Sequence, residues 1–265
     1  MGRIFITGST TGLGLIAGTQ LLARGHEVVF HARNAQRAAE LKRELPGDHS
    51  IAIGDLSSME QTLQIAEQVN ELGAINAVIH NAGAGYGGSV RRKLEDLPDT
   101  FAVNVLAPYI LTTKIDGPKR LVYLSSSMHR VKPDWDDVQW QKRAWNGSQA
   151  YSESKFFVTV LAFAVARLKA QVFSNAVDPG WVPTRMGGQG APDDLQAGAA
   201  TQVALVDGEA GPLSKLSGQY LHHMAVTRPS EGTRSQQAQE QLLRLCAELT
   251  GLTLSNQLRG VHHAD

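Results

Sequence analysis

The 265-residue sequence contains one cysteine, Cys246, which excludes a disulfide framework within one chain. It has no surplus of charge either, because 25 basic and 25 acidic side chains balance, so no basic surface for nucleic acid is expected. No apolar run reaches the roughly 18 residues that a membrane-spanning helix needs. These absences, with no targeting pattern at the start of the chain, predict a cytoplasmic protein in which Cys246 is a small core residue.

Short runs rich in β-branched residues alternate with helical patterns along the chain. Runs that are apolar throughout are typical of strands covered on both faces of a parallel sheet. They predict strands at 4–7, 27–31, 50–53, 76–80, 120–125, 172–177 and 218–221. Helices are expected near 12–24, 34–45, 57–72, 97–115, 151–169, 193–205 and 231–249. The alternation predicts an α/β fold in one domain over residues 1–265, a doubly wound, seven-stranded parallel sheet flanked by helices, with ligands at its carboxyl edge.

A glycine-rich loop at 7–14, Thr-Gly-Ser-Thr-Thr-Gly-Leu-Gly, joins the first predicted strand to the first helix. Glycines let a backbone approach a pyrophosphate closely, and the helix N-terminus adds free N–H groups and a positive dipole end. The spacing is neither the G-x-G-x-x-G fingerprint nor a P-loop. By itself the loop fits either a phosphate site or a helix N-terminus capped by Ser or Thr.

Tyr151 and Lys155 lie four residues apart on a predicted helix, so both side chains lie on one face. A free tyrosine has a pKa near about 10, and a neighbouring ammonium favours the phenolate. The pair therefore suits acid–base catalysis near neutral pH. A bare Tyr-x-x-x-Lys pair also arises by chance on surface helices, so the motifs around it decide its weight.

Further motifs stand at the ends of predicted strands, except for Asn104, which lies in the helix predicted near 97–115. They are Asp55-Leu56, Asn81-Ala82-Gly83, Asn104 within 100–104, Ser125-Ser126, and Pro179-Gly180. In this order, around the glycine loop and Tyr151-Ser152-Glu153-Ser154-Lys155, they resemble the short-chain dehydrogenase/reductase family, closely over 3–185 and more loosely beyond. The resemblance implies a Rossmann-type fold and an oxidoreductase that uses a nicotinamide cofactor.

The resemblance also implies catalytic roles. Tyr151 would donate its proton to the carbonyl oxygen of the substrate as hydride arrives, and Lys155 would hold the nicotinamide ribose and lower the tyrosine pKa. Ser126, the second serine of its pair, would bind the same oxygen, with Ser127 as the alternative. Asn104 would fix a water that links the lysine to solvent. No Gly-x-Ser-x-Gly elbow surrounds the serines, which argues against a serine hydrolase.

The resemblance also implies the cofactor-binding residues, most of which follow predicted strands. They are Gly8, Ser9, Thr10, Thr11, Gly12, Leu13, Gly14, Asp55, Leu56, Asn81, Ala82, Gly83, Tyr151, Lys155, Pro179, Gly180, Val182 and Thr184. Asp55-Leu56 would contact adenine, and Thr184 would contact the nicotinamide carboxamide.

The end of the second strand bears on the choice between NADP and NAD. No acidic residue occurs from 28 to 39, whereas an acid there would accept bonds from the ribose 2′-hydroxyl of NAD and repel a 2′-phosphate. Arg33 suits a phosphate, and Arg37 lies one helical turn later; alternatively, Arg33 only solvates a turn. We predict that NADP(H) is preferred and NAD(H) possible, because Thr11 stands where many NADP-using relatives carry a second cation.

The segment between Ser126 and Tyr151 spans 151 − 126 = 25 positions, which is longer than usual in the family. Its His129-Arg130, paired Asp136-Asp137 and run into Ala-Tyr resemble the retinol dehydrogenase and protochlorophyllide reductase branch. That branch implies bulky, apolar carbonyl compounds and alcohols.

Four tryptophans and an acidic group accompany this segment. Trp135, Trp140, Trp145 and Trp181 either line an apolar substrate pocket or, for three of them, anchor the loop on the core. Asp134, Asp136 and Asp137 are interpreted as a solvated acidic loop, and no metal site is expected, because no histidine spacing supports one.

The helix after Asn104 ends at Asp116-Gly117-Pro118, about one turn early for the family. The resemblance implies that this helix and the one carrying Tyr151 form a tetramer contact. A shorter helix and a long insert therefore favour a monomer or dimer.

These features predict hydride transfer between NADPH and a fairly apolar carbonyl or alcohol, with substrate loops near 84–96, 127–150 and 185–225. Two alternatives stay open, a non-catalytic NADP-binding sensor and a lyase or epimerase on the same fold. The intact Asn104, Ser126, Tyr151 and Lys155 argue against the sensor, and the short C-terminal part argues against the second.

Overall fold

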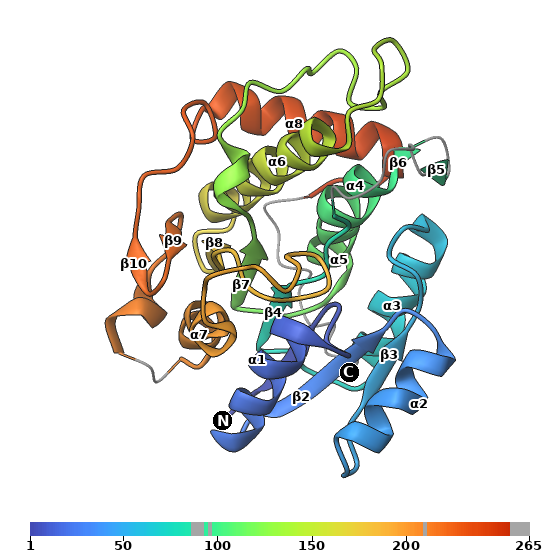
Figure 1. The fold of residues 1–265 in the computed structure, drawn as a ribbon, viewed down its shortest axis with the longest axis vertical. Helices are drawn as coiled ribbons and strands as arrows, with labels where there is room; N and C mark the ends of the chain where they lie inside the picture. The colour runs from blue at the N-terminus through green and yellow to red at the C-terminus, as the bar shows by residue number, and fades with distance from the viewer. Residues whose placement is uncertain (86–92, 95–96, 209–210, 255–265) are drawn as a thin grey trace, which may run out of the picture.

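The computed structural model describes residues 1–85, 93–94, 97–208 and 211–254, and within these an eight-stranded sheet forms the centre of the protein (Figure 1). The strand order is β10-β9-β8-β7-β4-β1-β2-β3. The strands are β1 (Arg3–Ile6), β2 (Glu27–Ala32), β3 (Ile51–Ile53), β4 (Ala77–His80), β7 (Arg120–Leu124), β8 (Phe173–Asp178), β9 (Tyr220–His222) and β10 (Ala225–Val226). The seven strands from β1 to β9 in this sheet pair in parallel, which confirms the doubly wound Rossmann-type fold.

The eighth strand corrects the predicted seven-stranded, all-parallel sheet. β10 pairs antiparallel with β9, with Ala225 opposite His222. The tight turn between them places His223 at φ 43° and Met224 at φ 66°, in the left-handed region that favours glycine. Because neither turn residue is Gly, Asn or Asp, the sequence carries no hairpin signal at this edge.

Helices cover both faces of the sheet (Figure 1). They are α1 (Gly12–Ala23), α2 (Ala35–Glu44), α3 (Met59–Glu71), α4 (Asp99–Phe101), α5 (Ala107–Lys114), α6 (Gly147–Leu168), α7 (Leu195–Val206) and α8 (Gln236–Thr250). Alternate residues of β1 point to opposite faces, so Ile4 and Ile6 pack with α1 and α7, and Phe5 packs with α3, α5 and α6. Among the described helices, none combines the length and apolar character that crossing a membrane requires.

The remaining elements are short. They are the hairpin strands β5 (Lys93–Leu94) and β6 (Leu97–Pro98), the π-helical η1 (Ala102–Leu106), and the 3-10 turns η2 (Ser127–His129) and η3 (Gly211–Lys215). The predicted helix at 97–115 is thus divided into α4, η1 and α5. A π-helical turn inserts one residue, and such turns are frequent at functional sites.

The segment at 127–150 is fastened to α6 by charged groups. The buried Asp137 carboxylate accepts the N–H groups of Gln141 at 2.6 Å, Lys142 at 3.1 Å and Arg143 at 3.2 Å. Arg143 donates twice to Glu153 of α6, at 2.8 and 2.7 Å. The interpretation of a solvated acidic loop was therefore wrong for Asp137, which holds the loop together.

Three of the four tryptophans anchor the same segment. Trp135 packs against Phe157 with ring centroids 4.9 Å apart, and Trp140 packs edge-on against Trp145 at 5.2 Å. Trp181, by contrast, is 55% exposed. Of these three, Trp135 anchors the loop on the core, whereas Trp140 and Trp145 pack against each other within the loop. Trp181 is the tryptophan that remains for ligand contact.

Candidate active site

The glycine loop at 7–14 turns from β1 into α1 at the carboxyl edge of the sheet. Gly8 and Gly12 adopt φ of 63° and 59°, a conformation that only glycine takes without strain. A Cβ on Gly14 would lie 2.5 Å from Asn81 Nδ2 and 2.6 Å from the Gly8 carbonyl oxygen. The first and third glycines are thus required by internal packing. The same test at Gly12 meets nothing closer than 3.4 Å, so this glycine faces the open side of the loop.

The N-terminus of α1 is left open. Its N-cap residue, Thr11, makes no capping hydrogen bond with its side chain. The other helices of at least ten residues are capped by the side chains of Asn34, Ser58, Asn146, Asp194 and Ser235. First-turn N–H groups of α1 are therefore available to an anion, and the bare Gly12 lets that anion approach. This cradle fits the pyrophosphate of a dinucleotide.

Hydrogen bonds from the segment after β4 hold the inner side of the glycine loop. Asn81 Nδ2 donates to the carbonyl oxygens of Thr7 and Gly8 at 2.9 and 3.1 Å, and Ala82 N donates to Thr7 Oγ1 at 3.0 Å. The predicted Ser9 is fully buried, and its hydroxyl accepts from His31 N at 2.8 Å. Its side chain serves the fold, and only its backbone remains for a cofactor. Thr10 and Leu13 are half-buried, and Thr11 is exposed.

His31, at the end of β2, ties three strand ends together and was not among the predicted residues. Its Nδ1 accepts from Gly8 N at 2.9 Å, and its Nε2 lies 2.9 Å from the Gly54 carbonyl oxygen. Burial lowers the pKa of His31 to about 4, against the opposing effects of the Gly54 bond and the Asp55 charge. The ring is therefore neutral at physiological pH, and Nε2 carries the donated proton.

The two cations predicted for a 2′-phosphate both have carboxylate partners. Arg33 Nε lies 3.2 Å from Asp55 Oδ2, and Arg37 Nη1 lies 2.6 Å from Glu40 Oε2. The side chain of Arg33 is 70% exposed, so its ion pair is weak and a phosphate can compete for it.

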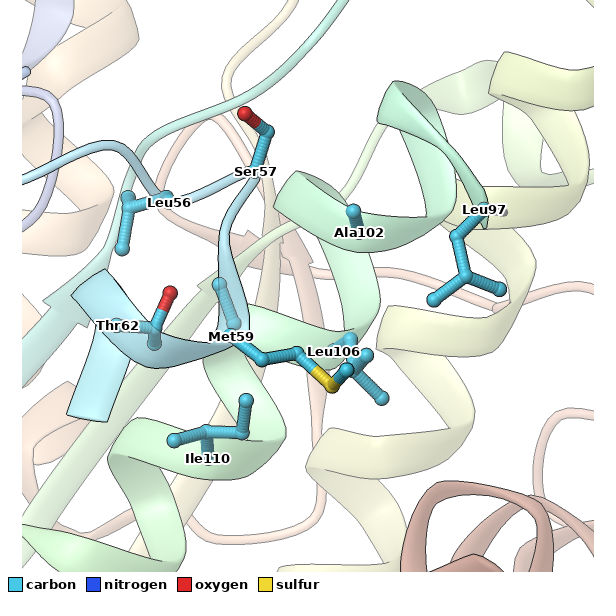
Figure 2. Close-up of a pocket in the computed structure, with 9 residues that line it drawn as sticks. Leu56, Ser57, Met59, Thr62, Leu97, Ala102, Leu106 and Ile110 are labelled. Carbon is cyan, nitrogen blue, oxygen red and sulfur yellow. The ribbon is translucent and has the colours of Figure 1, made fainter. Parts of the chain in front are cut away.

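The turn at Asp55-Leu56 is packed against the π-helical turn η1. Figure 2 shows a narrow apolar crevice where side chains of this turn and α3 face those of η1 and α5. They are Leu56, Met59 and Thr62 on one side and Ala102, Leu106 and Ile110 on the other. The position predicted to contact adenine is therefore joined by direct packing to the turn that carries Asn104.

Asn104 lies in η1, buried, with its amide fully oriented. Its Oδ1 accepts from Ala84 N at 2.7 Å, and its Nδ2 donates to the Ala84 carbonyl oxygen at 3.1 Å and to Ser154 Oγ at 2.8 Å. It therefore links the segment that follows β4 to Ser154 of α6, one position before Lys155.

Tyr151 and Lys155 lie on one face of α6, and both are buried. Lys155 Nζ donates to the carbonyl oxygen of Leu124, the last residue of β7, at 2.8 Å and lies 5.5 Å from the ring centroid of Tyr151. A Cβ on Gly83 would lie 3.6 Å from Lys155 Nζ and 3.5 Å from Asn104 Oδ1. The lysine and the asparagine thus face the same space beside Gly83.

Burial lowers the pKa of Lys155 to about 8, and the negative charge of Asp178 opposes that shift. Asp178 ends β8 and is itself buried; it accepts from Gly180 N at 3.0 Å and from the Tyr220 hydroxyl at 3.3 Å. Asp178 was not among the predicted site residues, because its effect on Lys155 depends on strands β7 and β8 being neighbours.

The three consecutive serines have different surroundings. Ser125 Oγ is buried and bonded to Thr159 Oγ1 at 2.7 Å. Ser126 Oγ accepts from Met128 N at 3.2 Å, which caps η2, and within the described residues its hydroxyl donates to no other group. Ser127 is exposed at the start of that turn. Of the three, Ser126 has the surroundings that suit a hydrogen-bond donor to a substrate oxygen.

The segment after β8 lies over the glycine loop. Gly180 takes φ 84°, and Val182 is buried against Gly198 of α7. Thr184 Cγ2 lies 3.4 Å from the position of a Cβ on Gly12. Pro179 to Thr184 therefore face the glycine loop across the open end of α1, as a shared cofactor site requires.

Comparison with known proteins agrees with this geometry. Residues 3–116 match the family model of short chain dehydrogenases. A short-chain dehydrogenase, chyC of Penicillium rubens, is 39% identical over 259 residues, covering 96% of this chain and 99% of that protein. Retinol dehydrogenase 13 of Homo sapiens is 26% identical over 199 residues, covering 69% and 60% of the two chains.

Solved structures share the fold. A putative uncharacterized protein from Mycobacterium paratuberculosis superposes with a TM-score of 0.78 at 19% identity, covering 96% of this chain and 94% of that one. The NADPH-bound carbonyl reductase from chicken fatty liver superposes with a TM-score of 0.67 at 22% identity, covering 86% and 99%.

We expect Gly14→Ala to destabilise the protein by about 2 kcal/mol, because its Cβ would overlap the backbone of Gly8. In a thermal melt this corresponds to a loss of several degrees. Gly190→Ala is the matched control, because its Cβ would meet nothing within 4 Å. Equal melting temperatures for the two variants would show that the loop is not packed as described.

Proposed function

Because the chain belongs to the short-chain dehydrogenase/reductase family, we propose that it transfers hydride between NADP(H) and a carbonyl or alcohol compound. The observation that carries this proposal is the position of Lys155, whose buried Nζ is bonded to the end of β7 beside the ring of Tyr151. A surface Tyr-x-x-x-Lys pair would be solvated and would have no such partners.

In the proposed reduction, the nicotinamide supplies the hydride. Tyr151 donates the proton of its hydroxyl to the carbonyl oxygen, and Ser126 donates a hydrogen bond to the same oxygen. The Lys155 ammonium lowers the free energy of the tyrosinate that remains, because opposite charges attract strongly away from water. Asn104 keeps the backbone at Ala84 fixed beside the lysine. In the oxidation of an alcohol the same groups act in reverse.

The preference for NADPH rests on the end of β2. The side chain of His31 is neutral and turned inward, and Arg33 projects into solvent at that position. A 2′-phosphate would gain the guanidinium at the cost of a weak, exposed ion pair. The chicken carbonyl reductase that shares the fold was solved with NADPH bound, which supports the same preference.

A fairly apolar substrate is supported by apolar side chains that are exposed beside the glycine loop. Trp181 and Met186 are exposed at 55% and 38%, and both belong to the segment that covers the glycine loop. The proposed substrate loops are 84–96, 127–150 and 185–225, of which 86–92, 95–96 and 209–210 lie outside the described residues. A non-catalytic sensor and a lyase or epimerase remain the alternatives. A sensor would not need the buried lysine beside Tyr151, and the short C-terminal part argues against the lyase or epimerase.

We further infer that the protein is a monomer or dimer. α8 lies alongside α6 (Figure 1), and its buried Leu242 and Cys246 share a core cluster with Phe157 and Leu161. The Tyr109 hydroxyl of α5 donates to the Leu252 carbonyl oxygen at 2.7 Å. The chain itself therefore covers much of the surface through which the resemblance implied a tetramer.

Sedimentation velocity of the purified protein should show one species with the mass of one or two chains. The reason is that α8 would have to leave α6 before a second subunit could pack there. A stable tetramer at micromolar concentration would contradict the inference.

Tyr151→Phe should lower turnover by about 100-fold or more, because it removes the proton donor and retains the ring. The measurement is a panel of carbonyl compounds and alcohols with NADPH and NADH, alongside cofactor binding followed by tryptophan energy transfer. Binding should stay within about twofold, since the ring is retained.

Ser126→Ala and Ser127→Ala form a matched pair in the same panel. The first should lower turnover by about tenfold or more, and the second should not.

If some substrate turns over and Tyr151→Phe keeps most of the rate, the proton-transfer assignment is wrong.

A further inference from the structure

Arg185 stands one position beyond the predicted cofactor residues, and it reaches back to the first helix. Its Nη2 donates to Thr11 Oγ1 at 2.8 Å, across 174 positions of sequence. Thr11 is the N-cap of α1 whose hydroxyl does not cap the helix. A guanidinium thus occupies the rim of the open helix N-terminus.

The backbone on either side of Arg185 is fixed, so this placement is not that of a loose surface chain. Thr184 N donates to the Val182 carbonyl oxygen at 2.8 Å, and Gly188 N donates to the Thr184 carbonyl oxygen at 2.9 Å. Thr184 Oγ1 also accepts from Gly187 N at 3.1 Å. The turn holds the arginine above the glycine loop.

The charge of Arg185 is uncompensated. Within the described part of the chain it forms no ion pair, and its partner Thr11 is neutral. The two other arginines of this edge, Arg33 and Arg37, are each paired with a carboxylate. The first turn of α1 contains no acidic residue either. Positive charge therefore accumulates at one place, from the guanidinium and from the positive end of the helix dipole.

We propose that Arg185 binds the pyrophosphate of the dinucleotide and clamps it against the N-terminus of α1. The planar guanidinium can offer two parallel N–H donors to phosphate oxygens, while the first-turn N–H groups of α1 bind from the other side. Arg185 then supplies from the segment after β8 a cation that the loop at 7–14 lacks. The inference rests on the proposed function, since it needs a dinucleotide in this site.

The test is calorimetric titration of the full-length protein with four ligands. NADPH and NADH contain both the pyrophosphate and the nicotinamide. ADP-ribose contains the pyrophosphate but no nicotinamide, and 2′-AMP contains a 2′-phosphate but no pyrophosphate. Arg185→Ala should weaken NADPH, NADH and ADP-ribose by about tenfold each and leave 2′-AMP unchanged. Arg185→Lys should lose less, because it keeps the charge but not the fork.

Two controls separate binding from a structural role. Arg244→Ala removes an exposed arginine of α8 and should change none of the affinities. Thr11→Val removes the contact that holds Arg185 and should weaken the binding of the three pyrophosphate ligands less than Arg185→Ala does. If Thr11→Val lowers the affinities as much as Arg185→Ala does, the arginine has only a structural role, which is to hold its segment against Thr11.

The failures are distinguishable. Unchanged affinity for ADP-ribose in Arg185→Ala overturns the clamp, and so does a loss confined to NADPH and 2′-AMP, which would place the arginine at the 2′-phosphate. If the wild-type protein binds neither NADPH nor ADP-ribose, the proposed function itself fails.

Discussion

A charged ammonium buried at the junction of helix and sheet is the constraint on which the candidate site depends. Removing Lys155 from water disfavours its charge, and the pKa near 8 records that cost. The Leu124 carbonyl oxygen and the Asp178 carboxylate reduce it, and these groups end the neighbouring strands β7 and β8. A parallel sheet therefore delivers the compensation, because its strands all end at one edge. Tyr151 lies one helical turn from the charge and benefits from it.

At the same edge of the sheet, the glycine loop at 7–14 is held in place by neutral groups. His31 is kept neutral and used as a two-sided connector between the glycine loop and the end of β3. Asn81 and Ser9 saturate the inner side of the loop with hydrogen bonds. What stays unsatisfied is the N-terminus of α1, so the polar groups left open are those that face a phosphate. The fold thus separates a buried catalytic charge from an accessible anion site.

Local chemistry explains which parts could be predicted from the sequence. Gly8 and Gly14 could be predicted because a left-handed backbone and close packing admit no other residue. Tyr151 and Lys155 could be predicted because helical spacing puts them on one face. Asp137 was misread because its partners are backbone N–H groups, which leave no mark in the sequence. Asp178 and Arg185 act across 23 and 174 positions, on Lys155 and Thr11, and no local pattern encodes such a meeting. β10 was not predicted, because the turn that leads into it is formed by His223 and Met224 and not by Gly, Asn or Asp.

The buried ammonium can be measured directly, without knowing the substrate. Lysine labelled with ¹³C at Cε, with Lys155→Arg to assign its resonance, gives the pKa from an NMR titration between pH 6 and 12. We predict that Lys155 titrates near 8, well below the other lysines, and that Asp178→Asn moves it lower still because a compensating charge is lost. A Lys155 resonance that titrates with the exposed lysines, near their ordinary pKa of about 10.4, would contradict the account.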